Sequence, residues 1–269
     1  MDKGRGRGRD DLGEAREGPA LSIVIPVFNE GENIVRTLES VRESVHVQPL
    51  EVLIVYDFEE DGTLPVVRRL QERMPELTLQ RNRLGRGVLN ALKSGLTAAR
   101  APFVLVTMAD LSDDPRDVDA MYELARGGAD VVAGSRYMRG GRQVGGPFIK
   151  RSLSRVAGLT LHYLAGIPTH DATNNYKMYS RRLLDATVIE SGGGFELALE
   201  MTVKAHLTGL TVAEVPTTWR DRTAGESRFL LRKWMPYYLR WYRKAMIARL
   251  RPRRGPERRT PADVSDDAA

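Results

Sequence analysis

The 269-residue sequence contains no cysteine, and this absence excludes several kinds of chemistry. Without thiols the chain can form neither disulfides nor thiolate metal sites, and it has no cysteine nucleophile. The composition therefore fits a reducing compartment and argues against zinc chemistry. The four histidines do not restore a metal site, because none of them has the spacing of a ligand pair.

Long apolar runs are also missing. No stretch approaches the roughly 18 to 20 apolar residues that a membrane span requires. The N-terminal segment, MDKGRGRGRDD, lacks the apolar core of a signal peptide. We therefore expect a cytoplasmic chain that does not cross a membrane.

Two common phosphate-binding signatures are absent. No GxGxxG motif follows the first apolar run, and no GxxxxGK[ST] motif occurs anywhere. These absences exclude the glycine-rich cradles of dinucleotide-binding proteins and of P-loop proteins. If the chain binds phosphates, a metal ion and arginines must hold them.

Short apolar runs alternate with helical patterns through the first half of the chain. Residues 21–27, LSIVIPV, are rich in β-branched side chains, which is typical of a strand buried on both faces. The next apolar residues recur at helical spacing up to Val45. The alternation predicts an α/β fold with a doubly wound, mostly parallel sheet. Further strands are expected at 51–56, 77–80, 103–108 and 130–133, and further helices at 63–74, 88–100 and 115–126.

The pattern changes after residue 147, where we expect helices at 148–164 and 195–207 and one strand at 211–216. No linker separates the halves, so residues 19–250 are interpreted as one domain. Its donor-nucleotide half is 19–135 and its acceptor half is 136–250. The polar compositions of residues 1–18 and 251–269 predict disordered tails.

Carboxylates follow three of the predicted strands. Asp110, Asp113 and Asp114 lie within five residues of one another after the fourth strand, and Glu30 and Asp57 follow the first two. The carboxyl ends of parallel strands share one edge of a sheet, where ligands bind. Oxygen ligands around a phosphate-bearing substrate suit Mg²⁺ or Mn²⁺. Taken alone, the aspartate cluster is equally consistent with a solvated turn that caps the next helix at Pro115.

The motifs at these strand ends resemble those of family 2 glycosyltransferases, which have the GT-A fold. They are PVFNE, VYDFEEDGT, ADLSDDP and GSRY, in this order. In the second half, DATNNYKMY, EVP and DRTAGESRF resemble dolichyl-phosphate mannosyltransferases and related polyprenyl-phosphate glycosyltransferases. The resemblance covers residues 21 to about 235.

The resemblance implies an inverting transfer of a hexose, of mannose or glucose type, from a GDP- or UDP-linked donor, with Mg²⁺ or Mn²⁺ bridging the diphosphate. It assigns the metal to Asp110 and Ser112, and catalytic contacts to Asp110 and Arg136. Asp113 is the candidate third metal ligand, which would compensate for an acid that the motif lacks at Met108. The residues matching the nucleotide edge are Pro26, Phe28, Glu30 and Asp57. Those matching the loop over the sugar are Asp171 and Thr173, and those matching a phosphate-binding segment are Arg222, Ser227 and Arg228.

The hypotheses about the reaction differ in the acceptor that they assume. A polyprenyl phosphate is already an anion and can attack without a general base, whereas a hydroxyl acceptor needs one. Glu200 is the candidate base for a hydroxyl acceptor, although an ordinary residue of the helix FELALEM is the favoured interpretation. Met108 stands where the family has the first acid of its DxD motif. This replacement motivates a third hypothesis, a nucleotide-sugar-binding protein that has lost catalysis.

Positive charge is concentrated toward the C-terminus. The net charge is +6, and residues 228–254 contain ten arginines and lysines but no acid. Residues 148–159 mix three cations with an apolar helical face, and residues 233–244 mix cations with aromatics. Both compositions suit the headgroup region of a membrane, although the aromatics could instead cover the core. We expect peripheral association with the cytoplasmic face of a membrane and, with no recognisable module for it, no nucleic-acid partner.

Overall fold

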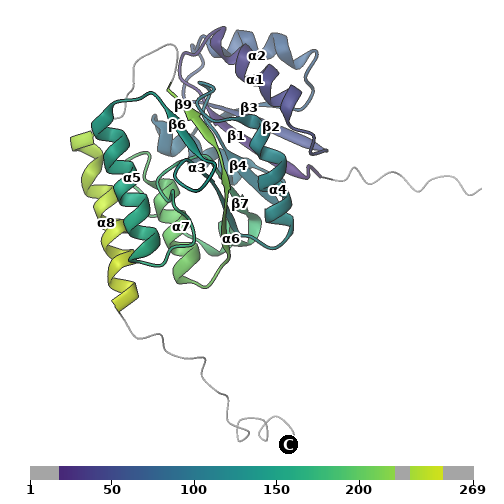
Figure 1. Cartoon of the computed structure of the whole chain (residues 1–269). Coiled ribbons are helices and arrows are strands. Elements are labelled where there is room, and N and C mark those ends of the chain that lie inside the picture. The colour runs from purple at the N-terminus through teal and green to yellow at the C-terminus, as the bar shows by residue number, and fades with distance from the viewer. Residues whose placement is uncertain (1–17, 222–230, 251–269) are drawn as a thin grey trace, which may run out of the picture.

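The computed structural model describes residues 18–221 and 231–250, which fold around a seven-stranded sheet (Figure 1). The strands are β1 Leu21–Pro26, β2 Leu50–Tyr56, β3 Leu77–Arg81, β4 Phe103–Val106, β5 Val131–Ser135, β6 Arg142–Val144, β7 Lys177–Ser180, β8 Val212–Pro216 and β9 Thr218–Arg220. The helices are α1 Asn33–Ser44, α2 Thr63–Gln71, α3 Val88–Ala98, the 3-10 turn η1 Pro115–Asp117, α4 Val118–Arg126, α5 Phe148–Tyr163, α6 Arg181–Ala186, α7 Leu197–Leu207 and α8 Leu231–Leu250.

The strand order is β3-β2-β1-β4-β7-β5-β8, and β6 and β9 form a separate two-stranded parallel ribbon. Strand β7 runs antiparallel to both β4 and β5, and the other neighbours in the large sheet are parallel. The predicted doubly wound, mostly parallel sheet is therefore confirmed. Parallel strands place the carboxyl ends of β1, β2, β4 and β5 at one edge.

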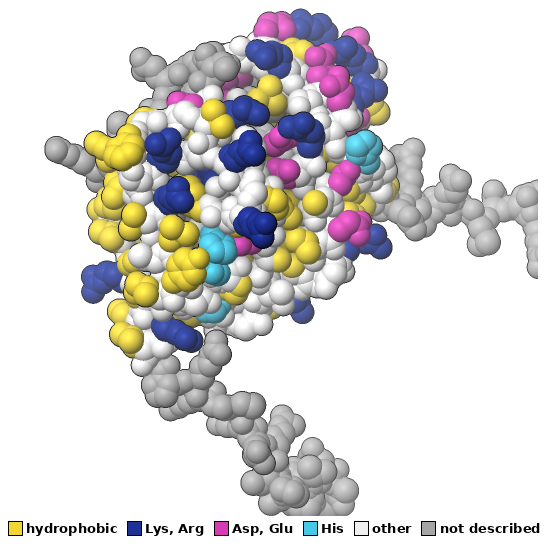
Figure 2. Space-filling view, viewed as in Figure 1, with side chains coloured by type: hydrophobic (Ala, Val, Ile, Leu, Met, Phe, Trp, Pro, Cys, Tyr) yellow, Lys and Arg dark blue, Asp and Glu magenta, His cyan; other side chains and the backbone are white. Residues whose placement is uncertain are grey.

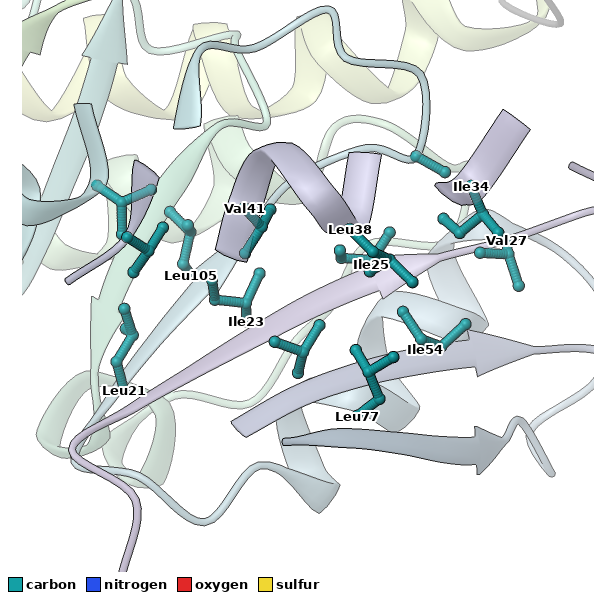
Figure 3. Close-up of a cluster of buried hydrophobic side chains, with 14 of the residues drawn as sticks. Leu21, Ile23, Ile25, Val27, Ile34, Leu38, Val41, Ile54, Leu77 and Leu105 are labelled. Atoms are coloured by element: carbon teal, nitrogen blue, oxygen red, sulfur yellow. The ribbon is translucent and has the colours of Figure 1, made fainter. Parts of the chain in front are cut away.

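Alternation along β1 explains why the sheet is covered on both faces. Ile23 and Ile25 pack into a cluster with α1, α2 and α4, whereas Val24 points to the other face and packs with α3 and α7. Side chains in a strand alternate between faces, so a continuous apolar run is required when both faces are covered. Figure 3 shows the first of these clusters between β1 and α1.

A third apolar cluster lies outside the sheet, between α5, α7 and α8. Leu161 of α5, Val203 of α7 and Trp241 of α8 are all buried in it. This cluster fixes α5 and α8 as an outer layer (Figure 1). Within the described ranges, no helix is both long enough and apolar enough to pass through a bilayer.

The structure differs from the sequence expectations mainly after residue 136. One strand was expected there, whereas β6, β7, β8 and β9 are present. Strand β7 is short and begins with a lysine, so its sequence KMYS has no strand pattern of its own. The helix expected at 115–126 opens as the 3-10 turn η1 before α4. The predicted tails lie outside the described residues, apart from Gly18.

Candidate functional site

The acidic loop that follows β4 turns back on itself at the edge of the sheet. Leu111 adopts a left-handed backbone conformation with φ of 55°, and the backbone N–H of Ser112 donates to Oδ1 of Asp110 at 3.1 Å. The carbonyl of Ser112 accepts from the backbone N–H of Arg220 at 2.8 Å. Asp110 and Ser112 therefore share one tight turn, beside the end of β9.

Asp113 points into the protein from this loop. Its side chain is buried, and its Oδ1 has no hydrogen-bond partner among the residues that the structure describes. Burial raises the pKa of Asp113 to about 7, and the negative charge of Asp110 adds to the rise. Arg136, Asn174 and Thr107 act in the opposite direction. An unsatisfied buried carboxylate oxygen is costly and favours a cationic ligand nearby.

The loop fits a divalent ion that is shared with a substrate. No group of three or more acidic or histidine side chains within residues 18–221 and 231–250 is arranged to hold a metal. Magnesium, however, is commonly bound by one or two carboxylates together with substrate phosphates. Asp110, Asp113 and the hydroxyl of Ser112 supply such a set. Met108 adds no oxygen and packs against the apolar cluster on the α3 face of the sheet.

Residues predicted to bind the nucleotide lie after β1 and β2. The partly exposed Phe28 meets Phe58 edge-on at 5.4 Å between ring centroids, and the Arg86 guanidinium lies 4.8 Å from the centroid of Phe58. Asp57 accepts from the side chain of Asn82 at 2.7 Å and from the backbone N–H of Gly87 at 2.8 Å. Asp57 thus ties together the loops after β2 and β3. The aromatic and guanidinium surfaces suit a planar base.

The remaining two residues predicted at this edge lie at the end of β1 and in the turn that follows it. Pro26 is the last residue of β1. The backbone N–H of Glu30 donates to Oγ1 of Thr63 at 3.0 Å, which joins the turn to the start of α2. Both predicted residues therefore lie at the strand ends where a nucleotide would bind.

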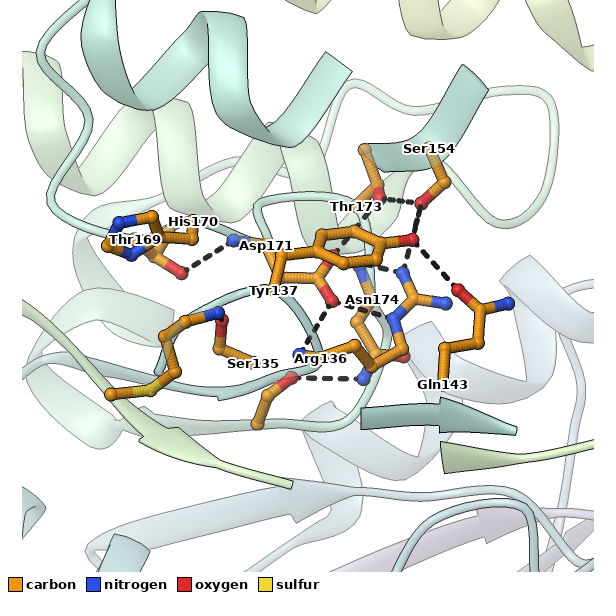
Figure 4. Close-up of polar contacts among 12 residues, drawn as sticks. Ser135, Arg136, Tyr137, Gln143, Ser154, Thr169, His170, Asp171, Thr173 and Asn174 are labelled. Atoms are coloured by element: carbon orange, nitrogen blue, oxygen red, sulfur yellow. Dashed lines mark hydrogen bonds and ion pairs between the residues drawn. The ribbon is translucent and has the colours of Figure 1, made fainter. Parts of the chain in front are cut away.

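Arg136 and Asp171 form a buried, two-pronged ion pair (Figure 4). Nε and Nη2 of Arg136 donate to the two oxygens of Asp171 at 2.6 and 3.0 Å. The backbone N–H of Arg136 also donates to Oδ2 of Asp171 at 3.1 Å. Burial alone would raise the pKa of Asp171, but the charge and hydrogen bonds of Arg136 hold it below its usual value. The pair joins the loop after β5 to the loop before β7.

Helix α5 is connected to this pair through Ser154. The Ser154 hydroxyl accepts from Nη2 of Arg136 at 3.0 Å and lies 2.8 Å from Oγ1 of Thr173. The Tyr137 hydroxyl donates to the Ser154 hydroxyl at 3.0 Å. It also lies within hydrogen-bonding distance of Oε1 of Gln143 on β6. The structure therefore brings Arg136, Asp171 and Thr173 together and adds Ser154 and Tyr137 to the group.

Lys177 is a further buried residue that the sequence analysis did not select. It donates to the backbone carbonyls of Asp171 and Asn174, at 3.0 Å for the former. Burial lowers the pKa of Lys177 to about 8, although the Asp171 carboxylate acts in the opposite direction. The available signal was a lysine within the DATNNYKMY motif, close to Asp171 in sequence. No sequence signal pointed to Ser154, because the helix that contains it was interpreted only for its exposed face.

Glu200 lies on α7 with its carboxylate turned to the 190–191 turn. Its oxygens accept from the backbone N–H groups of Glu190 and Ser191 at 2.6 and 2.7 Å. The Ser191 hydroxyl also donates to it, and Lys204 pairs with it at 2.7 Å. This buried geometry matches a structural role. Arg222, Ser227 and Arg228 lie outside the described residues, and that segment follows Asp221, whose N–H donates to the Val144 carbonyl at 2.9 Å.

The family model for glycosyl transferase family 2 matches residues 22–187. Polyprenol monophosphomannose synthase from Mycolicibacterium smegmatis is 31% identical over 229 residues, which is 81% of this chain and 84% of that protein. Dolichol-phosphate mannosyltransferase from Pyrococcus furiosus is 25% identical over 212 residues, and the match covers 77% of this chain but only 58% of that protein.

Solved structures show the same fold. A mannosyltransferase from Pyrobaculum calidifontis in complex with GDP-Man and Mn²⁺ superposes with a TM-score of 0.55 at 18% identity, covering 87% of this chain and 74% of that one. Glucosyl-3-phosphoglycerate synthase from Mycobacterium tuberculosis, with Mn²⁺ and UDP, gives 0.55 at 18% identity over 93% of this chain and 86% of that one. The fold is GT-A. The chain therefore belongs to glycosyl transferase family 2, as its strand-end motifs predicted.

Proposed function

We propose that this glycosyltransferase moves mannose from GDP-mannose to a polyprenyl phosphate, with inversion at the anomeric carbon. The names of the two curated relatives support mannose and a polyprenyl acceptor. The Pyrobaculum structure with GDP-Man supports the donor. A UDP-linked glucose donor is the alternative, because the Mycobacterium structure holds UDP.

The contacts of the Glu200 carboxylate favour a phosphate acceptor over a hydroxyl acceptor. A hydroxyl acceptor needs a general base, and Glu200 was the candidate. Its carboxylate already accepts hydrogen bonds from the 190–191 turn and pairs with Lys204. A carboxylate engaged in this way inside the protein is poorly placed to remove a proton from a substrate. A phosphate acceptor removes the requirement, because it is an anion at neutral pH.

In this reaction, different residues of the chain would bind the metal, position the nucleotide and fix the loop over the sugar. Asp110, Ser112 and Asp113 would hold a divalent ion, which when bound supplies positive charge beside the departing diphosphate. Phe28 and Asp57 would position the nucleotide, and Arg136 with Asp171 and Thr173 would fix the loop over the sugar. The acceptor phosphate oxygen attacks the anomeric carbon while the bond to the diphosphate breaks. Arg222, Ser227 and Arg228 remain proposed phosphate contacts.

The reaction is tested by radiolabelled transfer. Purified protein, GDP-[¹⁴C]mannose, Mn²⁺ and a polyprenyl phosphate should yield label in an organic-extractable lipid. Asp110→Ala should abolish the transfer, whereas Asp185→Ala, at an exposed position of α6, should not. A water-soluble labelled product would contradict the lipid acceptor, and label from UDP-[¹⁴C]glucose alone would contradict the donor.

A parallel assay addresses the competing hypotheses. Glu200→Gln should retain transfer to lipid phosphate in whatever fraction of the protein is folded. Loss of transfer to a glycan acceptor with a normally folded Glu200→Gln protein would favour the hydroxyl reaction. Tight donor binding in calorimetry without turnover on any acceptor would favour the impaired binding protein that Met108 suggested.

A further inference from the structure

Glu214, the acid of the EVP motif, lies on β8 and holds the segment that leads into Asp171. Its Oε2 accepts from the hydroxyl of Thr169 at 3.0 Å and from the backbone N–H of His170 at 2.8 Å. The ring Nδ1 of His170 lies 2.6 Å from the other carboxylate oxygen and carries a proton there, because a carboxylate only accepts. Glu214 therefore fixes both of the residues that precede Asp171.

The Thr169 hydroxyl connects Glu214 to the backbone of Asp171. The backbone N–H of Asp171 donates to Oγ1 of Thr169 at 3.1 Å, while the same hydroxyl donates its proton to Glu214. A hydroxyl can accept and donate at the same time. Thr169 is fully buried. The position of the Glu214 carboxylate is therefore passed directly to the residue that holds Arg136.

Glu214 also reaches the other member of the ion pair. Strand β8 pairs in parallel with β5, which ends at Ser135, and the hydroxyl of Ser135 donates to the Glu214 carboxylate. Ser135 directly precedes Arg136, whose backbone N–H, Nε and Nη2 all donate to Asp171. One carboxylate thus bridges the residues beside Arg136 and the residues beside Asp171.

The Glu214 carboxylate is charged although it is largely enclosed. Its side chain is 13% exposed. Burial alone would raise the pKa of Glu214, but hydrogen bonds from His170, Ser135 and Thr169 hold it below its usual value. Figure 2 shows acidic side chains gathered toward the upper right of this face, where Figure 1 places α1, α2 and α4, and few elsewhere on it. Because its hydrogen bonds go to the chain itself, Glu214 is placed to support the side chains of the site.

The other end of the same loop is held independently of Glu214. Lys177 donates to the backbone carbonyls of Asp171 and Asn174. The side chain of Asn174 donates to the carbonyl of Gly134 at 3.0 Å. Loss of the Glu214 contacts should therefore displace the Asp171 end of the loop without releasing the whole loop.

We propose that Glu214 is a positioning residue that aligns the buried ion pair of the site through the hydroxyls of Thr169 and Ser135. The inference rests on the proposed function, in which this pair fixes the loop over the sugar. A displacement of about 1 Å at such a group can cost about 100-fold in rate. Glu214 should therefore affect the rate of transfer more than the binding of the nucleotide, whose predicted contacts follow β1 and β2.

Glu214→Gln tests this alignment. The amide keeps the size of the side chain, but its NH₂ group turns donors toward groups that also donate. Glu51→Gln is the matched control, because Glu51 is likewise buried and accepts from Ser22 and from Arg100. Glu51 lies near the start of β2, at the edge of the sheet opposite to the site.

Nuclear magnetic resonance of the protein alone measures the alignment. The Nε–H of Arg136, which donates to Asp171 at 2.6 Å, should exchange with solvent at least about tenfold faster in Glu214→Gln. Glu51→Gln should leave this exchange unchanged. No acceleration in Glu214→Gln, or equal acceleration in the two variants, would reduce Glu214 to a general contribution to stability and would overturn the proposal.

The kinetics of mannosyl transfer give a second readout. Glu214→Gln should lower kcat by about 10- to 100-fold, while the Kd for GDP, measured by calorimetry, stays close to that of the unmodified protein. Glu51→Gln should retain kcat. A weaker affinity for GDP with an unchanged kcat in Glu214→Gln would contradict the positioning role.

A second pair of variants keeps the test decisive if Glu214→Gln does not fold. Thr169→Val removes the hydroxyl that joins Glu214 to Asp171, whereas Thr169→Ser keeps a hydroxyl there. The Arg136 Nε–H should exchange faster in Thr169→Val than in Thr169→Ser, and equal exchange would overturn the proposal. If even the unmodified protein transfers no mannose, the proposed function fails, while the exchange measurement still decides the role of Glu214.

Discussion

Arg136 and Asp171 show how a residue pair predicted for substrate contact also supports the loops around the site. Both side chains are buried, and Asp171 is fully enclosed. A buried carboxylate without its cation is far more costly than the same carboxylate in water. The GSRY and DATNN motifs therefore depend on each other, although 35 residues separate the two members of the pair.

Removing the cation alone should be strongly destabilising. We expect Arg136→Met to lower the free energy of unfolding by about 3–5 kcal/mol, because it leaves Asp171 buried and unpaired. The double variant Arg136→Met/Asp171→Leu should recover part of that loss. Urea unfolding monitored by circular dichroism measures both, with Arg73→Met, which breaks an exposed pair with Glu39, as a control that changes little. A double variant less stable than Arg136→Met would contradict this account.

Lys177 should give the protein a pH-dependent stability. Its pKa is about 8 in the folded chain, against an ordinary value of 10.5. Between these pH values the folded protein has released the proton while the unfolded chain still holds it. Stability therefore rises with pH in this window, by at most about 3 kcal/mol, and the contribution is flat below pH 8.

The variant Lys177→Met isolates this effect. We expect the unmodified protein to gain stability relative to Lys177→Met as the pH rises from about 8 to 10.5, because only the unmodified protein carries the titrating group. Urea unfolding at several pH values measures the difference between the two proteins. Parallel pH profiles would show that Lys177 keeps an ordinary pKa.

At the scale of elements, β1, β2, β4 and β5 could be predicted because burial on both faces leaves a nearly continuous apolar run. Strand β3, at the edge of the sheet, is largely not buried and was predicted from its place in the alternation of strands and helices. The predicted bounds of these five strands are correct to within about two residues. Strand β7 could not be predicted in this way. Its Lys177 is buried only because the ammonium group donates hydrogen bonds to carbonyls of the 171–174 loop. These contacts belong to the tertiary structure and leave no pattern in the sequence. Ser154 was missed for the same reason, since its partners come from two other loops.

The packing of α5 on the 169–171 loop requires a glycine. A Cβ at Gly158 would lie 2.3 Å from the carbonyl oxygen of His170, and a backbone atom cannot move aside as a flexible side chain can. We expect Gly158→Ala to destabilise the protein by about 1–3 kcal/mol by pushing α5 away from the loop that holds Asp171. Gly192→Ala is the control, because nothing lies within 4 Å of a Cβ there.

The same pair of variants distinguishes local from global effects. If α5 moves as a unit, Gly158→Ala should also speed hydrogen exchange in residues 148–163, while β1 and β2 keep their protection. Mass spectrometry of peptic fragments measures this. Equal loss of protection in β1 would mean that the substitution weakens the whole domain instead of the α5 contact.

For the whole molecule, the strand-end motifs identified the fold and the family because they lie at the one edge that a parallel sheet forms. They could not show which acids would hold a metal ion, since Asp113 is buried below the loop, whereas the partly buried Met108 packs against an apolar cluster. Ligand-induced stabilisation tests that ion directly. A ligand at 100 times its Kd stabilises the native state by about 2.7 kcal/mol, which for a domain of this size is roughly 5–10 °C in Tm.

We therefore expect GDP-mannose with Mn²⁺ to raise the Tm clearly, and GDP-mannose with EDTA to raise it much less. Asp110→Asn should lose the Mn²⁺-dependent part of the shift, because a neutral amide replaces one of the few carboxylates available to the ion. Asp185→Asn, an exposed position on α6, should behave like the unmodified protein. Equal shifts with and without Mn²⁺ would mean that the arginines hold the diphosphate unaided, and that the replacement at Met108 has removed the metal from the donor site.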